Sequence, residues 1–85
     1  MCTNIATRTR VVGSAKTGSG WTAVDEATVG FDHATHAWLD HALRIDFTGP
    51  AGDHAAVELD LASGRALLAA LRDVIADAER SGIAE

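Results

Sequence analysis

The chain has few cysteines, aromatic residues and basic residues, which argues against a disulfide-bonded protein and against a nucleic-acid-binding protein. It has a single cysteine, Cys2, so an intrachain disulfide is impossible. It has no tyrosine and two phenylalanines, and its 7 basic residues are scattered among 12 acidic ones, for a formal net charge of −5. Proteins that bind nucleic acid usually concentrate positive charge on one face and use aromatic rings for base stacking. We therefore expect no nucleic-acid partner.

Long apolar segments are also missing. No run approaches the roughly 18 apolar residues that span a bilayer, and the first residues, Met1 to Asn4, do not form a basic and then apolar signal segment. We expect a cytoplasmic protein with no membrane partner. Its 85 residues, 47% of them apolar, predict one globular domain over residues 1–85.

Apolar and polar residues alternate with period two in four segments, which is typical of strands with one buried and one solvent-exposed face. The alternating segments are residues 5–11, 27–32, 43–47 and 57–61. The second strand is expected to begin near Trp21, with a break or bulge at Asp25 and Glu26. Composition predicts a flexible loop over Gly13–Gly20 and a turn over Gly49–Asp53.

The period then changes to that of an amphipathic helix. Ser63 is the expected N-cap and Gly82 the expected C-terminal stop. The apolar residues of this stripe are Leu67, Leu68, Leu71, Val74, Ile75 and Ala78. The fold class is therefore α+β (ββββα), a four-stranded antiparallel meander with one C-terminal helix packed on its apolar face. Because so short a sheet leaves two edges and a thin core, we expect a homodimer.

Three of the four histidines lie within nine residues of one another, in the connection between the second and third strands. In a meander, the start of the first strand, the end of the second and the start of the third lie at one end of the sheet. Cys2, His33, His36 and His41 should therefore gather there, with His33 and His41 leaning toward the apolar face. His54, which begins the fourth strand, should lie at the opposite end.

Imidazoles and a thiolate together form a sensible transition-metal site, and zinc or iron, less favourably copper, suits these ligands. His33, His36 and His41 would be ligands, and Cys2 a fourth ligand or a nearby thiolate. Asp32 and Asp40 would orient the imidazoles by hydrogen bonds, or Asp32 would itself be a ligand. The spacing of the histidines matches no established metal motif, so the alternative that they are solvated loop residues stays open.

Two other functions remain open. A metal-free catalyst would use one histidine as general acid or base, with Cys2 as a nucleophile. A non-enzymatic, dimeric accessory or regulatory module is the other.

Trp21 and Trp38 are expected in a core or interface, and Trp38 could wall a pocket. The expected solvent-facing residues of the sheet are Arg44, Asp46, Glu58 and Asp60.

Several stretches of the chain resemble a family of short actinobacterial proteins of uncharacterised function, some encoded near natural-product genes. The stretches are residues 1–8, 20–21, 31–33, 41–47 and 57–59. The resemblance covers nearly the whole chain. It implies a functional cluster at Cys2, Asp32, His33, His36, His41 and Asp46. With the histidine set, it favours a metalloenzyme of specialised metabolism that acts on a small molecule.

Overall fold

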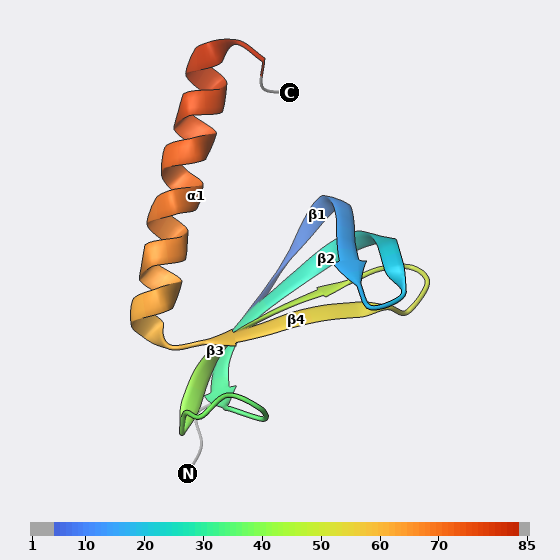
Figure 1. The fold of residues 1–85 in the computed structure, drawn as a ribbon, viewed down its shortest axis with the longest axis vertical. Helices are drawn as coiled ribbons and strands as arrows, with labels where there is room; N and C mark the ends of the chain where they lie inside the picture. Colours follow the sequence, from blue (N-terminus) through green and yellow to red (C-terminus); the bar gives the residue numbers. More distant parts are fainter. Residues whose placement is uncertain (1–4, 84–85) are drawn as a thin grey trace.

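The computed structural model describes residues 5–83, and the predicted order of four strands and one helix is confirmed (Figure 1). The elements are β1 (Ile5–Thr17), β2 (Gly20–His33), β3 (His41–Thr48), β4 (His54–Leu59) and α1 (Leu61–Ser81). The strands form one sheet in the order β1-β2-β3-β4, with each neighbouring pair antiparallel.

The strand register separates an apolar face from a polar face. Phe31 pairs with Ile5 on one side and with Leu43 on the other, and Leu43 pairs with Leu59. Because side chains alternate along a strand, these rows of odd-numbered residues share one face. Its larger members are Ile5, Val29, Phe31, Leu43, Ile45, Phe47, Val57 and Leu59. The other face carries Arg8, Thr28, Arg44, Asp46 and Glu58.

The expected glycine-rich loop is mostly strand, so that prediction was wrong. β1 continues to Thr17 and pairs with the start of β2, leaving only Gly18 and Ser19 between the strands. Glycine weakens a strand but does not prevent ladder hydrogen bonds. Inside the turn, the Thr17 hydroxyl accepts a hydrogen bond from the backbone N–H of Ser19 at 3.2 Å.

The break predicted at Asp25 takes the form of a bulge in the opposite strand. Arg10 pairs with Glu26 and Gly13 pairs with Val24, so one extra residue of β1 lies between these two pairs. A bulge of this kind bends the strand and increases its twist.

The helix begins earlier than the sequence predicted. Asp60, not Ser63, is the N-cap, and its carboxylate accepts a hydrogen bond from the backbone N–H of Ser63 at 2.7 Å. The prediction for the other end is confirmed, because Gly82 adopts the left-handed conformation with φ 77°. Its N–H donates to the carbonyl of Glu79 at 3.3 Å.

The position of α1 differs from the expectation that the helix lies on the sheet. Figure 1 shows α1 leaving the end of β4 and standing away from the strands. Only its first turns approach β3, where a Cβ on Gly64 would collide with the side chain of Leu43. All 21 residues of α1 are described, and none is buried. Asp60 alone separates β4 from α1, so the helix continues from the end of the strand without a loop in which the chain could reverse its direction.

The buried apolar residues within 5–83 are small. They are Val24, Ala27 and Ala42. Both tryptophans are exposed, with 70% of Trp21 and 102% of Trp38 accessible to solvent, so neither forms the core or pocket wall expected of it in this chain. No helix within residues 5–83 has the length and apolar character needed to cross a membrane.

Candidate functional site

Two of the predicted histidines meet at the end of the sheet. His33 ends β2 and His41 begins β3, and the register pairs them directly. Their ring centroids are 4.5 Å apart, with the ring planes tilted by 30°. Phe31 stacks on His41 at 5.5 Å. Both imidazoles follow the parity of Phe31 and Leu43, so they extend the apolar face of the sheet to its edge.

A backbone carbonyl favours one tautomer of the His33 ring. Its Nδ1 lies 3.4 Å from the carbonyl oxygen of Asp40. A carbonyl oxygen can only accept a hydrogen bond, so this contact requires the proton on Nδ1. The neutral ring then carries its lone pair on Nε2, which is the arrangement that metal-binding histidines commonly show.

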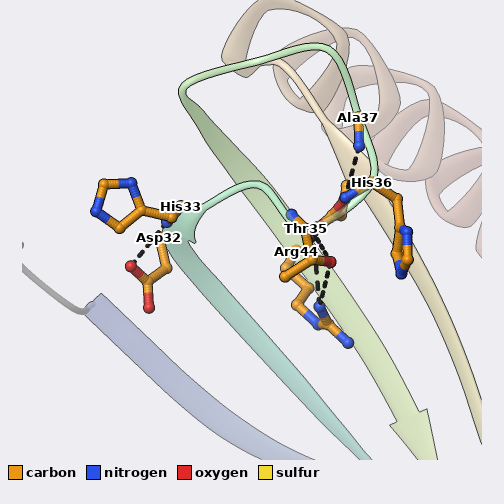
Figure 2. Close-up of polar contacts among 7 residues, drawn as sticks. Asp32, His33, Thr35, His36, Ala37 and Arg44 are labelled. Atoms are coloured by element: carbon orange, nitrogen blue, oxygen red, sulfur yellow. Dashed lines mark hydrogen bonds and ion pairs between the residues drawn. The ribbon is translucent and has the colours of Figure 1, made fainter.

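The two aspartates hold the backbone around the imidazoles. The Asp32 carboxylate accepts a hydrogen bond from the backbone N–H of His33 at 2.7 Å (Figure 2). Asp40 acts through its carbonyl, which also accepts the N–H of Ala34 at 3.3 Å. The sequence predicted that both residues would orient imidazoles, and the contact described is that of Asp40 with His33.

His36 lies apart from this pair. Figure 2 shows the imidazoles of His33 and His36 on different sides of the loop. His36 lines a shallow hollow on the polar side together with Ala37, Arg44 and Glu58. The sheet fixes where His33 and His41 point, because they belong to strands. His36 belongs to the connecting loop, where strand parity does not apply.

Glu58 holds this loop in place from β4. One carboxylate oxygen accepts the backbone N–H and the hydroxyl of Thr35, each at 2.9 Å. The other accepts the backbone N–H groups of His36 at 2.9 Å and Ala37 at 3.0 Å. These bonds, led by those from the N–H groups of Thr35 and Ala37, lower the pKa of Glu58 to about 2. Arg44 adds an ion pair at 3.6 Å.

Sequence reasoning placed Arg44 and Glu58 on the solvent-facing side of the sheet, and the register pairs these two residues directly. It missed the loop contact, because the donors to Glu58 are mainly backbone N–H groups, which every residue but proline carries. One signal was available: residues 34–40 were expected to form a loop, and the backbone N–H groups of a loop, which lacks the hydrogen-bond ladder of a sheet, need acceptors from elsewhere in the chain.

Cys2, the fourth predicted ligand, lies outside the described residues. Within residues 5–83, no three His, Cys, Asp or Glu side chains come close enough together to hold a metal ion. The His33–His41 pair is therefore the part of the predicted site whose geometry the structure describes. Two imidazoles on neighbouring strands supply nitrogen ligands that suit zinc, iron and copper.

A second histidine contact lies at the opposite end of the sheet, where the sequence placed His54. The Nδ1 of His54 lies 3.4 Å from a carboxylate oxygen of Asp46. His54 also lines an open hollow of about 700 Å³ bounded by β1, β3 and β4, with Lys16 and Phe47 among its walls. An imidazole oriented by a carboxylate beside a hollow is the arrangement of many general bases.

Comparison with known proteins relates nearly the whole chain to one family. The sequence profile described as a family of unknown function, DUF6295, matches residues 1–84. No curated protein and no solved structure matches the chain.

Proposed function

The chain belongs to this family of unknown function, and from its geometry we propose that it is a small metal-binding protein whose site is built on His33 and His41. The observation that carries the proposal is the direct pairing of these imidazoles, with the Nδ1 proton of His33 held by the Asp40 carbonyl. A histidine held in this way presents Nε2 as a metal ligand.

Cys2 is the proposed third ligand. In the sequence it precedes Ile5 by three residues, and Ile5 pairs with Phe31, two residues before His33. His36 has no place in this set, because its side chain lies on the Glu58 side of the loop. Three protein ligands leave one tetrahedral position open, which is the pattern of catalytic rather than structural sites.

The metal of this proposal is zinc or iron, with copper third. When bound, such an ion would act as a Lewis acid or activate a water molecule. The residues of the chain would bind and orient it, and the exposed edge of the sheet would admit a small-molecule substrate. The likeness to short actinobacterial proteins encoded near natural-product genes supports a cytoplasmic metalloenzyme of specialised metabolism.

The test is elemental analysis by mass spectrometry on protein purified without a histidine tag. We expect near-stoichiometric zinc, iron or copper in the wild type and in the control variant His36→Ala. We expect its loss in the double variant His33→Ala/His41→Ala, with the sheet retained by circular dichroism. A wild type that neither contains nor takes up metal, or a double variant that keeps it, overturns the proposal.

A second candidate is a metal-free catalyst that uses His54 as general base. Its supporting observation is the contact of His54 with Asp46 at 3.4 Å beside the hollow. The carboxylate would hold the proton on Nδ1 and leave Nε2 to take a proton from the water molecule that attacks a substrate.

Hydrolysis of p-nitrophenyl acetate in the presence of EDTA tests the candidate, because a positioned imidazole cleaves this ester without metal. We expect His54→Gln to lower the rate by about 100-fold, the lower end of what a positioned base contributes, and Asp46→Asn to lower it less. His36→Gln removes another exposed imidazole and should have little effect. Equal rates for His54→Gln and the wild type would eliminate this candidate.

A further inference from the structure

An apolar wedge separates α1 from the sheet. Figure 1 shows the two diverging from the point where α1 leaves β4. The wedge has a volume of about 340 Å³. Val29, Leu43 and Ile45 line it from the sheet, and Leu61, Leu68 and Leu71 line it from the helix.

The helix carries its apolar stripe past the wedge into solvent. Leu68 is 62% exposed and Val74 is 66% exposed. Leu71 and Ile75 are exposed on the same stripe. A continuous apolar surface of this kind on a soluble protein marks a site of association.

The surface area of the chain shows how much is left uncovered. The chain exposes 6620 Å². The scaling of surface with mass for folded monomers gives about 4,800 Å² for a chain of this size, so the excess is about 1,800 Å². Two copies that each buried this excess would cover about 3,600 Å² in total, which lies within the range for obligate homodimers.

The radius of gyration leads to the same conclusion. It is 14.6 Å for the Cα atoms, whereas a compact domain of this length has a radius of about 12 Å. The described chain is therefore extended in the way expected of one half of a larger compact body.

A second copy fits the wedge for chemical and geometric reasons. The chain presents both an apolar helix and an apolar wedge, and a two-fold axis brings each onto its counterpart in the other copy. Arg65 is the one ionisable residue among those described as lining the wedge, so two identical acidic chains would bring little like charge together there.

We propose that the protein is a homodimer in which α1 of each copy lies in the wedge of the other, against Val29, Leu43 and Ile45. This interface is inferred without use of the proposed metal site, which lies at the edge of the same sheet face. It would cover the apolar sheet face that α1 leaves open in its own chain.

The first measurement is the mass in solution, by light scattering after gel filtration, on tag-free protein with EDTA present. We expect 17.6 kDa, twice the chain mass of 8.8 kDa, and a melting temperature that rises with protein concentration. A folded species of 8.8 kDa overturns the proposal. A dimer that EDTA dissociates would be bridged by metal and would overturn the wedge interface as well.

Two helix variants locate the interface. Leu68→Glu places a charge on the apolar stripe, and Ala66→Glu places the same charge on the opposite, exposed side of α1. We expect Leu68→Glu to lose the dimer, whether or not the monomer stays folded, and Ala66→Glu to keep it. A dimer that survives Leu68→Glu, or that both variants dissociate equally, overturns the wedge interface.

Isotope-filtered NMR on a mixture of labelled and unlabelled wild-type chains tests the interface without a substitution. Intermolecular contacts between methyl groups of Leu68 or Leu71 and those of Val29 or Ile45 are expected. Their absence in a sample that is dimeric would exclude the wedge.

Discussion

Glu58 performs a task for which its sequence neighbourhood gives little indication. The loop over residues 34–40 has no ladder, and an unpaired backbone N–H that is shielded from water is costly. Glu58 lies on β4, yet its carboxylate accepts hydrogen bonds from three consecutive residues of the loop between β2 and β3. Only 10% of its side chain is exposed. One carboxylate thus fixes the conformation of the loop that separates His33 from His41.

Replacing Glu58 by Gln should loosen this loop. The amide keeps one acceptor oxygen, but its NH₂ group cannot accept the remaining N–H donors. We expect faster hydrogen exchange at Thr35, His36 and Ala37, measured by NMR, and a lower melting temperature. Glu79→Gln, the same change on the exposed helix, is the control and should alter neither quantity. Unchanged exchange at the three amides would contradict the role of Glu58.

The hydrogen bonds of the Glu58 carboxylate should also make the stability of the protein depend on pH. The pKa of Glu58 is about 2 in the folded chain, below the ordinary glutamate value of 4.5. A lowered folded-state pKa stabilises the protein fully above the unfolded value and loses that effect as pH falls through the folded value. Between pH 4.5 and pH 2, the wild type should therefore lose more stability than Glu58→Gln, as followed by circular dichroism during acid titration.

The sequence predicted the meeting of His33 and His41 but not the separation of His36. Strand alternation and meander topology define the face of a strand residue, so the parity argument was sufficient for the first two. The conformation of a loop residue depends instead on its own hydrogen bonds, which strand periodicity does not predict. The backbone N–H of His36 donates to Glu58, a residue 22 positions away in the chain.

At the scale of elements, the junction between β4 and α1 determines the shape of the molecule. Ser63 and Asp60 are both good N-cap residues, and sequence alone does not choose between them. The end of β4 determines which of them caps the helix. Pairing of β4 with β3 ends at Leu59 opposite Leu43, so Asp60 is the first residue that can serve as the N-cap. The earlier start leaves a single residue, Asp60, between the strand and the helix.

Asp60→Ala should destabilise the helix start. The Asp60 carboxylate accepts the N–H of Ser63, and bonds from the Ser63 hydroxyl and N–H lower its pKa. We expect a melting temperature lower by about 4–8 °C, the shift typical for loss of a cap in a domain of this size. Asp60→Asn keeps an acceptor oxygen and should stay close to the wild type. Equal losses in both variants would indicate that the charge, and not the cap, matters.

The predicted loop over Gly13–Gly20 failed for a related reason. Glycine content is a weak guide when a neighbouring strand offers a complete ladder. Here Ser14, Ala15 and Lys16 pair in register with Ala23, Thr22 and Trp21, and the cooperative pairing outweighs the local preference.

At the scale of the whole molecule, the strand order followed from period-two alternation and short connections. The arrangement of the helix relative to the sheet did not, because an amphipathic stripe shows that a helix must be covered but not by which surface. In this chain, the small buried residues Val24, Ala27 and Ala42 leave the larger apolar side chains only partly covered. The same stripe that predicted a core helix is therefore the basis for the proposed dimer.

The exposure of both indoles determines which spectroscopic signal reports folding. Because most of Trp21 and all of Trp38 are exposed to solvent in the folded chain, we expect their fluorescence emission to resemble that of an unfolded peptide. Neither lies among the residues that line the wedge. We therefore expect tryptophan emission to change little when the chain unfolds or dimerises. Far-ultraviolet ellipticity from the sheet and the 21-residue helix is the signal that reports the loss of secondary structure.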